Sequence, residues 1–375
     1  MKILLDARLY GLENAGIGRY LVNLVGELAK IDKKNKYSIL LRKDYFHSLK
    51  LPENWKKILA DFRHYSFIEQ IKLPTIISSE KPNLSHFPHF NVPLFFTGKF
   101  VVTIHDLTMH RQGRNATTLV LPIYYAKRLP YKFLFRKAVN SSVAIISPTG
   151  AVKKDIIDYY KVDKDKISVV YEGISAFSLN SKNLSKFKLS RRYFIYVGNL
   201  YPHKNINRVI EAVMLLNRNS KIKTHLVIVS SRGVFTSRLK KTIKKMKAEK
   251  YVKFLGFVPD EELHVLLKKS VAFVYPSLSE GFGLQGLESL SAGTLVLASD
   301  ISAFREIYKE NAIYFNPFDF TSISEAMSDV VKIGGKKRSK MIEKGQKFVN
   351  RYSWSKMARQ TLKIYESSAR LRQGE

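Results

Sequence analysis

Short apolar segments alternate with amphipathic stretches along almost the whole chain, and this alternation constrains the fold more than any other feature. In the first half the apolar segments are Ile3 to Leu5, Tyr37 to Leu41, Phe100 to Ile104 and Ala144 to Ile146. Each has the length of a buried strand, and the stretches between them are long enough for crossover helices. The pattern predicts mainly parallel sheets covered by helices, an α/β fold.

A second series of the same kind follows a polar, basic segment at residues 178–192. Its expected strands are Tyr193 to Val197, His225 to Val229, Val252 to Leu255, Ala272 to Tyr275, Leu295 to Ala298 and Ala312 to Tyr314. A chain of 375 residues that is 45% hydrophobic can bury two cores. We therefore expect two Rossmann-like domains, residues 1–180 and 181–352, whose sheets face a central cleft.

Charge and cysteine content narrow the function classes. The 64 Lys and Arg against 31 Asp and Glu give a net charge of +33, which attracts polyanions such as nucleic acid, anionic lipid or phosphate-bearing substrates. The excess is +16 in residues 1–190 and +17 in residues 191–375, so neither half is a dedicated basic module. The absence of cysteine excludes disulfides, thiolate metal sites and a cysteine nucleophile.

The first residues lack the basic region and apolar core of a signal peptide, so we expect none, and the apolar stretches are interrupted by charge before the roughly 20 residues that a membrane span needs. We expect a cytoplasmic protein that binds peripherally to the inner face of the membrane. The basic, aromatic segment Tyr124 to Lys137 is a candidate for contact with anionic lipid. An ordinary amphipathic core helix explains this segment nearly as well.

The most specific segment is Tyr275 to Asp300. Glu280 follows an expected strand, a helix is expected from Leu284, and Glu288 lies about one turn inside it; the bend between them is Gly281-Phe282-Gly283. Two carboxylates and the free amides of a helix N-terminus can hold a sugar phosphate. The alternative is an exposed acidic loop followed by a helix salt bridge.

A similar arrangement follows Tyr193 to Val197. The segment Gly198-Asn199-Leu200-Tyr201-Pro202-His203-Lys204-Asn205 predicts a glycine turn and then a helix. Lys204 would stand at that helix N-terminus, where a diphosphate can lie. The alternative is a solvated surface lysine.

Two features of the first half are further candidates. Gly16, Gly18 and Arg19 belong to a predicted glycine loop before a helix, although glycine loops also serve as plain turns. His105 ends the strand Phe100 to Ile104, where side chains reach the cleft; the alternative is a core histidine bonded to Asp106. His86 and His89 have no completing ligand set, so we interpret them as loop packing and expect no metal site.

Glu280 and Glu288, eight residues apart around Gly-Phe-Gly and followed by Ser291-Ala292-Gly293, resemble the signature of the retaining GT-B glycosyltransferases of the group 1 family. The stretch Pro202-His203-Lys204-Asn205 resembles that family too. The resemblance implies that Glu280 contacts the donor sugar, Glu288 the nucleotide ribose and Lys204 the donor phosphates. Many relatives carry an arginine where this chain has Asn199.

The resemblance extends to other segments. Phe257 and Val258 are similar to the family's loop against the nucleotide base, although a strand, turn and helix capped by Asp260 accounts for them equally well. The segment from Gly16 to Arg19 is similar to the loop that approaches donor phosphate and acceptor, and His105 to a histidine that contacts the donor sugar. Residues 353–375 are expected to form a helix that packs back on the first domain.

The implied reaction is transfer of a hexose, mannose as first guess, from a nucleotide sugar with retention at the anomeric carbon. GDP-mannose is the expected donor and a UDP-sugar the alternative, with neither metal nor further cofactor. The expected acceptor is a glycan or a lipid-diphosphate-linked glycan in surface polysaccharide assembly, such as lipopolysaccharide O-antigen. Two alternatives remain open: a GT-B-fold nucleotide-sugar epimerase or hydrolase, and a nucleic-acid-binding basic protein, although no specific nucleic acid is expected.

Overall fold

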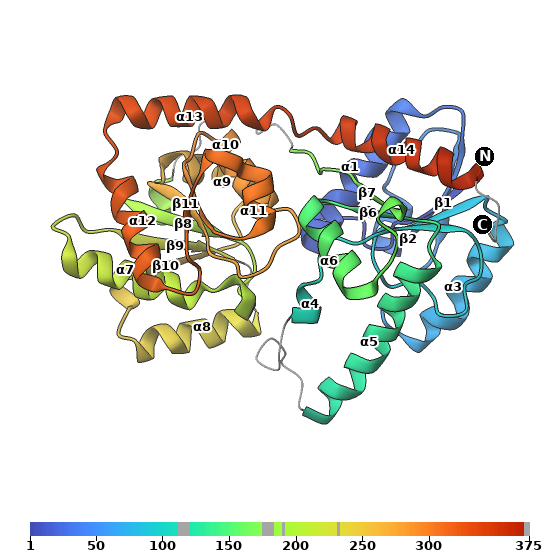
Figure 1. Ribbon diagram of the computed structural model, residues 1–375, viewed down its shortest axis with the longest axis horizontal. Helices are drawn as coiled ribbons and strands as arrows, with labels where there is room; N and C mark the ends of the chain where they lie inside the picture. The colour runs from blue at the N-terminus through green and yellow to red at the C-terminus, as the bar shows by residue number, and fades with distance from the viewer. Residues whose placement is uncertain (112–120, 175–183, 190–191, 231–232, 371–375) are drawn as a thin grey trace. The chain divides into compact units, whose positions relative to one another are not determined.

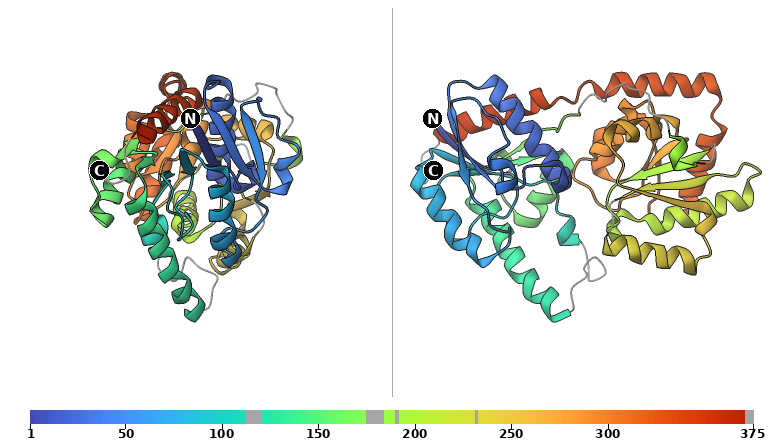
Figure 2. Two further views of the ribbon diagram at one scale, coloured as in Figure 1. Left: turned by 90° about the vertical axis from the view of Figure 1, so that its right-hand side faces the viewer. Right: turned by 180° about the vertical axis from the view of Figure 1, so that it is seen from behind.

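The computed structural model describes residues 1–111, 121–174, 184–189, 192–230 and 233–370, and the side chains of residues 121–127 lie outside this description (Figures 1 and 2). The chain divides into two compact units. The first contains Met1–Leu107 and the described parts of Leu119–Gly173 and Tyr352–Glu375, and the second contains the described parts of Thr108–Thr118 and Ile174–Arg351. The predicted boundary at residues 180–181 lies outside the described residues.

The first unit is built on a seven-stranded sheet in the order β3-β2-β1-β4-β5-β6-β7, and each adjacent pair is parallel. Its strands are β1 (Lys2–Asp6), β2 (Lys36–Leu41), β3 (Trp55–Leu59), β4 (Leu84–Phe87), β5 (Phe100–Thr103), β6 (Ala144–Ser147) and β7 (Ile167–Val169). Its helices include α1 (Ala15–Ile31), α2 (Lys43–Phe46), α3 (Phe67–Glu80), α5 (Leu121–Ser141), α6 (Gly150–Tyr160) and α14 (Trp354–Arg370). Helices cover both faces of the sheet (Figure 1).

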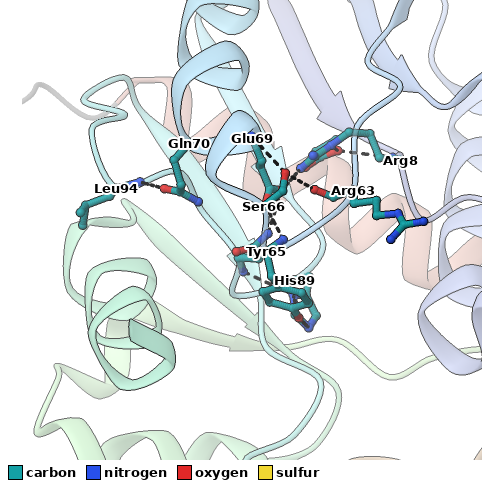
Figure 3. Close-up of polar contacts among 10 residues, drawn as sticks. Arg8, Arg63, Tyr65, Ser66, Glu69, Gln70, His89 and Leu94 are labelled. Atoms are coloured by element: carbon teal, nitrogen blue, oxygen red, sulfur yellow. Dashed lines mark hydrogen bonds and ion pairs between the residues drawn. The ribbon is translucent and has the colours of Figure 1, made fainter. Parts of the chain in front are cut away.

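The helices of this unit follow from their sequences. On α1 the predicted apolar side is buried, namely Tyr20, Leu21, Leu24, Val25 and Leu28. Ser66 caps α3, because its side chain accepts a hydrogen bond from the Glu69 amide, while Glu69 accepts one from the Tyr65 amide at 2.6 Å (Figure 3). Glu69 is fully buried and also forms an ion pair with Arg8 at 2.8 Å. The start of α3 is thereby fixed to the end of β1.

The second unit contains a six-stranded parallel sheet in the order β10-β9-β8-β11-β12-β13, the arrangement of a doubly wound fold. Its strands are β8 (Tyr193–Val197), β9 (His225–Val229), β10 (Val252–Gly256), β11 (Ala272–Tyr275), β12 (Val296–Ser299) and β13 (Ala312–Phe315). Its helices include α7 (Ile206–Asn219), α8 (Val234–Lys245), α9 (Asp260–Lys269), α10 (Leu284–Ser291), α11 (Ser302–Tyr308), α12 (Phe320–Lys332) and α13 (Gly335–Val349); α4 (Thr108–Arg111) also falls in this unit. The predicted fold class, two α/β domains with parallel sheets, is confirmed.

The helix α14 packs against α1 within the first unit. At its start the Trp354 backbone lies so close to Gly173 that a β-carbon at residue 173 would clash with it. Further along, the Tyr365 hydroxyl contacts His86 Nδ1 at 2.6 Å. The first unit is therefore assembled from two segments that lie far apart in the sequence.

Two expectations about local structure were wrong. The predicted glycine loop is not a loop at Gly16 and Gly18, because α1 already begins at Ala15. The Gly11 carbonyl packs against Gly18, where a β-carbon would clash. His86 lies within β4 and not in a loop. Within the described ranges, none of the helices has a segment long and apolar enough to cross a membrane.

Candidate functional site

The predicted site residues fall into two groups, one in each unit. The second unit holds Gly198, Asn199, Lys204, Phe257, Val258, Glu280, Gly281, Phe282, Gly283, Leu284 and Glu288, and the first unit holds Gly16, Gly18, Arg19 and His105. In the second unit most of them follow β8 and β11, which are neighbours in the sheet. The strand order reverses between these two strands, and open α/β sheets bind ligands beyond the carboxyl ends of strands at that point.

Lys204 and Glu280 form an ion pair at this switch point. Lys204 ends the short 3-10 helix Pro202–Lys204, and its Nζ donates to Glu280 Oε1. The two side chains retain only 10% and 14% of their exposure, so the charges are partly shielded from water. The ammonium also lies 5.8 Å from the centre of the Tyr275 ring, within reach of a cation–π contact. The lysine and the acid are thus brought together from 76 residues apart in the sequence.

Hydrogen bonds connect the two loops that carry this pair. The Leu278 amide donates to the His203 carbonyl at 2.8 Å. Asn205, in the left-handed conformation with a φ of 59°, donates from Nδ2 to the Pro276 carbonyl at 3.1 Å and to the Pro317 carbonyl at 2.7 Å. Asparagine tolerates this backbone conformation better than most residues. The positions of Lys204 and Glu280 are therefore set by backbone contacts on either side of the pair.

The Gly-Phe-Gly bend requires its last glycine. Gly283 has a φ of +97°, and a β-carbon there would collide with Tyr308 and Phe304. The Tyr308 hydroxyl donates to the Gly283 carbonyl at 2.5 Å and holds the bend in place. The helix α10 begins at Leu284, where the sequence predicts it, and its free N-terminal amides follow directly after the bend.

Glu288 and the glycine turn after β8 complete this group. Glu288 lies in α10, one turn from its start, and is 9% exposed. Gly198 has a φ of +141°, and the carbonyl of Asn199 accepts a hydrogen bond from the Tyr196 hydroxyl at 2.5 Å. Burial, together with the nearby Glu280 carboxylate, raises the pKa of both Tyr196 and Tyr275 well above the ordinary value. Both phenols stay neutral at pH 7.

Phe257 and Val258 follow β10, the edge strand of this sheet. The Phe257 side chain is 82% exposed, whereas Val258 is buried. An exposed aromatic ring at a strand end offers a flat surface for a nucleotide base. The base-binding role of this loop stays a prediction.

In the first unit, His105 comes just after β5 and is largely buried, with 15% of its side chain exposed. Its Nδ1 lies 3.3 Å from Glu172 Oε1, and its Nε2 lies 3.1 Å from the Pro88 carbonyl. The sequence offered Asp106 as the alternative partner, but these ring contacts go to residues after β4 and β7. Glu172 was missed, because a single acidic residue after a three-residue strand carries no recognisable pattern.

Gly16 and Arg19 lie in the first turns of α1, and Arg19 is partly exposed. A β-carbon at Gly16 would meet open space, so this position has no steric need for glycine, unlike Gly18. Within the described residues, no group of three or more His, Cys, Asp or Glu has the geometry of a metal site.

Comparison with known proteins gives two family matches. The family "Glycosyl transferases group 1" matches residues 179–348, and "Glycosyltransferase Family 4" matches residues 15–176. The O-antigen chain mannosyltransferase RfbU of Salmonella typhimurium is 28% identical over 320 residues, which cover 80% of this chain and 86% of the relative. The O-antigen chain mannosyltransferase B of Escherichia coli is 24% identical over 390 residues, which cover 98% of this chain and 100% of the relative.

A solved structure shares the fold over nearly the whole chain. Anabaena HepE, crystallised in complex with UDP-glucose, aligns with a TM-score of 0.73 at 15% sequence identity, covering 98% of this chain and 100% of that one. The two family matches leave only residues 1–14, 177–178 and 349–375 unmatched. Together with the two doubly wound parallel sheets, these matches show that the chain belongs to the GT-B glycosyltransferases of the group 1 family.

Proposed function

We propose that this glycosyltransferase moves mannose from GDP-mannose to a glycan acceptor, with retention at the anomeric carbon and without a metal ion. The observation that carries the proposal is the Lys204–Glu280 pair at the switch point of the second sheet, beside the N-terminus of α10. A cation, a carboxylate and free helix amides in one place match the parts of a diphosphate sugar.

The two charged side chains take different parts of the donor. The Lys204 ammonium stabilises the negative charge that develops on the leaving diphosphate, a role that a metal ion fills in other enzymes. Glu280 accepts hydrogen bonds from sugar hydroxyls, and Glu288 accepts them from the ribose. Because Lys204 Nζ already donates to Glu280 in the free protein, the carboxylate is oriented before the donor arrives.

In the proposed reaction the bond between the anomeric carbon and the phosphate oxygen breaks, and the acceptor oxygen bonds to the same face of that carbon. The proton of the acceptor hydroxyl passes to the departing phosphate oxygen. No side chain becomes covalently attached, so Glu280 serves as a positioning carboxylate. His105 takes the role that the family resemblance implies, a contact with the transferred sugar.

The sugar and the acceptor are proposed from the relatives. Two of them, both matched over most of their length, are named O-antigen chain mannosyltransferases. Mannose and an O-antigen-type glycan, free or linked to a lipid diphosphate, are therefore the first choices for this chain. A UDP-sugar is the alternative donor, since the HepE structure holds UDP-glucose.

We also propose that the protein binds peripherally to anionic membranes through a surface of the first unit. At the start of α3, Phe67 is 81%, Ile68 54% and Ile71 59% exposed. Phe95 is 75% exposed, and its neighbour Leu94 is bonded to Gln70 of α3 through a 2.8 Å hydrogen bond (Figure 3). We name as the α3 surface the side chains of Phe67, Ile68, Ile71 and Phe95. These exposed apolar side chains do not belong to the core of the unit, and such patches commonly mark interaction sites.

The charges around the α3 surface favour anionic lipid. Segments 62–79, 88–100 and 128–141 contain seven Lys and Arg and one acidic residue, Glu69, which is fully buried. On α5, Leu129 and Phe133 are 73% and 60% exposed. Of the segment 124–137 that the sequence suggested for lipid contact, the side chains of residues 124–127 lie outside the described residues. Apolar rings with surrounding cations suit the headgroup region of an anionic bilayer.

Vesicle flotation tests the membrane proposal. The protein should float with vesicles that contain anionic lipid and remain behind with neutral ones. At roughly 200 mM salt, where charge attraction is screened, Phe67→Ser combined with Phe95→Ser should abolish flotation, whereas Val234→Ser, an exposed apolar position of the second unit, should leave it unchanged. Equal flotation with both kinds of vesicle, or unchanged flotation of the double variant, contradicts the proposal.

Thermal stabilisation by nucleotide sugars, followed by product analysis, tests the enzymatic proposal. A ligand that binds the folded state raises the melting temperature, so GDP-mannose should stabilise the protein more than other donors do. Lys204→Ala and Glu280→Ala should abolish that response and turnover. Labelled donor incubated with and without acceptor separates transfer from epimerisation or hydrolysis. Wild-type activity in both variants would overturn the assigned site.

A further inference from the structure

The ring of His105 is held by three separate elements of the first unit. Glu172, after β7, contacts Nδ1 at 3.3 Å, and the Pro88 carbonyl, after β4, contacts Nε2 at 3.1 Å. The Tyr20 ring of α1 packs edge-on against the imidazole, with centroids 4.9 Å apart and planes at 81°. The ring is thus restrained from both ends and from one face.

Both ring nitrogens therefore face oxygen acceptors. A neutral imidazole carries one N–H and can serve only one of them, whereas a doubly protonated ring serves both. Glu172 is itself 5% exposed, and a buried carboxylate requires a hydrogen-bond partner or a compensating charge. Donation from His105 Nδ1 supplies that partner.

Three other titratable groups near the ring are neutral at pH 7. Burial lowers the pKa of His86 and of His89 to about 3, and burial raises the pKa of Tyr20 far above neutrality. The Tyr20 hydroxyl contacts Thr103 Oγ1 at 3.3 Å, and Thr103 contacts His86 Nε2 at 2.8 Å. Asp106 is adjacent in the sequence. The structure shows a contact between the His105 ring and the Glu172 carboxylate.

We propose that Glu172 is a positioning residue for His105: it accepts a hydrogen bond from Nδ1 and keeps the ring oriented for its contact with the transferred sugar. The proposal rests on the proposed function in one respect, the contact of His105 with the transferred sugar. The arrangement of the ring itself does not depend on that function.

Nitrogen-15 NMR of the full-length protein tests the arrangement without any substrate. In the wild type, His105 Nδ1 should carry a proton at pH 7. In Glu172→Gln the Nδ1 signal should move toward that of an unprotonated nitrogen, and Glu172→Asp should restore it in part. Glu80→Gln, which removes a different buried carboxylate of the same unit, should leave the His105 signals unchanged.

Steady-state kinetics tests whether Glu172 affects turnover through His105. Loss of one preorganised polar contact in the transition state costs roughly 100-fold in kcat, and Glu172→Gln, which keeps the shape of the side chain, should cost roughly tenfold with little change in KM. In a His105→Ala background, Glu172→Gln should have no further effect on kcat, because a residue that acts through another is silent when the other is absent.

Two results would overturn the proposal: an Nδ1 signal that is the same in wild type and Glu172→Gln, or additive losses in the double variant. Failure of the proposed function looks different. In that case no nucleotide sugar would be turned over by the wild type, while the NMR comparison would still decide whether Glu172 holds the ring.

Discussion

Single side chains decide much of the stability of the first unit, and Glu80 is the clearest case. This buried carboxylate accepts hydrogen bonds from Lys56 at 2.6 Å, Lys2 at 2.9 Å and Ser38 at 3.0 Å. Burial by itself would raise its pKa, but these three partners outweigh burial and lower the pKa to about 2 from an ordinary value of 4.5. The charged form is therefore stabilised in the folded protein.

Glu80→Gln should lower the free energy of unfolding by roughly 2 kcal/mol at pH 7. A carboxyl whose pKa is depressed by folding stabilises the protein above its unfolded pKa and loses that contribution as the pH falls. The difference between wild type and variant should therefore shrink between about pH 4.5 and about pH 2. Urea unfolding at a series of pH values measures this, and a pH-independent difference would contradict the assignment.

Gly283→Ala should destabilise the second unit by about 2 kcal/mol or more, because alanine resists a φ of +97° and its β-carbon would meet Tyr308 and Phe304. The variant should also lose its response to nucleotide sugars in a thermal shift assay. Gly335→Ala is the matched control, since a β-carbon at that position in α13 meets open space. The control should be neutral or stabilise by about 0.5 kcal/mol; equal losses in both would exclude the steric account.

At the scale of elements, the strands of the second unit agree with the sequence to within one residue at each end. Their apolar runs are continuous except for Lys253 in β10, and those of β8 and β11 end directly before Gly198 and Pro276. In the first unit β3, β4 and β7 were not predicted. Polar residues interrupt β3 and β4, namely Lys56, Lys57, Ser85 and His86, and β7 has three residues. Their pairing comes from the sheet and not from local pattern.

In the site, too, local sequence patterns predicted some features, whereas others depend on contacts between distant segments. Strand ends and the Gly-Phe-Gly bend predicted the elements that carry Lys204 and Glu280, and the structure places the two side chains in contact. The contact of His105 with Glu172 depends on two strand ends meeting across the sheet, at a separation of 67 residues. Single-sequence patterns do not contain such information, because neither residue marks the other.

The helix α14 stabilises the first unit through a polar contact that the sequence did not indicate. His86 is neutral, because burial lowers its pKa to about 3. Its Nδ1 contacts the Tyr365 hydroxyl at 2.6 Å and its Nε2 contacts Thr103 Oγ1 at 2.8 Å, so the neutral ring donates to one hydroxyl and accepts from the other. Tyr365 is fully buried, so water cannot replace it.

Tyr365→Phe should therefore cost about 1–2 kcal/mol of unfolding free energy, since it leaves a buried nitrogen without a partner. Tyr159→Phe, at a position that is 51% exposed, is the control and should change stability by less than about 0.5 kcal/mol. Denaturant unfolding of both variants measures the difference. A loss no larger than that of the control would show that the hydroxyl contact is not what holds α14.

At the scale of the whole molecule, the net charge of +33 acts independently of any one site. Charges spread over both halves give non-specific attraction to any polyanion, and salt screens that attraction. The charge alone therefore does not distinguish a lipid surface from nucleic acid. The apolar side chains of the α3 surface distinguish the two, because their burial in a lipid phase is favourable and the charged backbone of a nucleic acid offers no comparable apolar environment.

Binding to a random-sequence DNA duplex should fall steeply, by about tenfold or more, between roughly 50 and 200 mM salt and should be unaffected by the Phe67→Ser, Phe95→Ser double variant. Binding of the wild type to anionic vesicles should persist in part at the higher salt. Binding of the double variant to these vesicles should be lost at that salt. Gel-shift and flotation assays on the same preparations provide the comparison. Sequence-selective, salt-resistant DNA binding would favour the nucleic-acid alternative.

The discontinuity of the first unit has a consequence for biosynthesis. Residues Tyr352–Arg370 belong to it, although the whole of the second unit's main segment is translated before them. On the ribosome the second unit can complete its sheet while the first still lacks α14, the helix that covers α1 and contacts His86. The nascent chain thus exposes the uncovered side of α1 until residues 352–370 have been translated, and products truncated before them should be removed by cellular quality control.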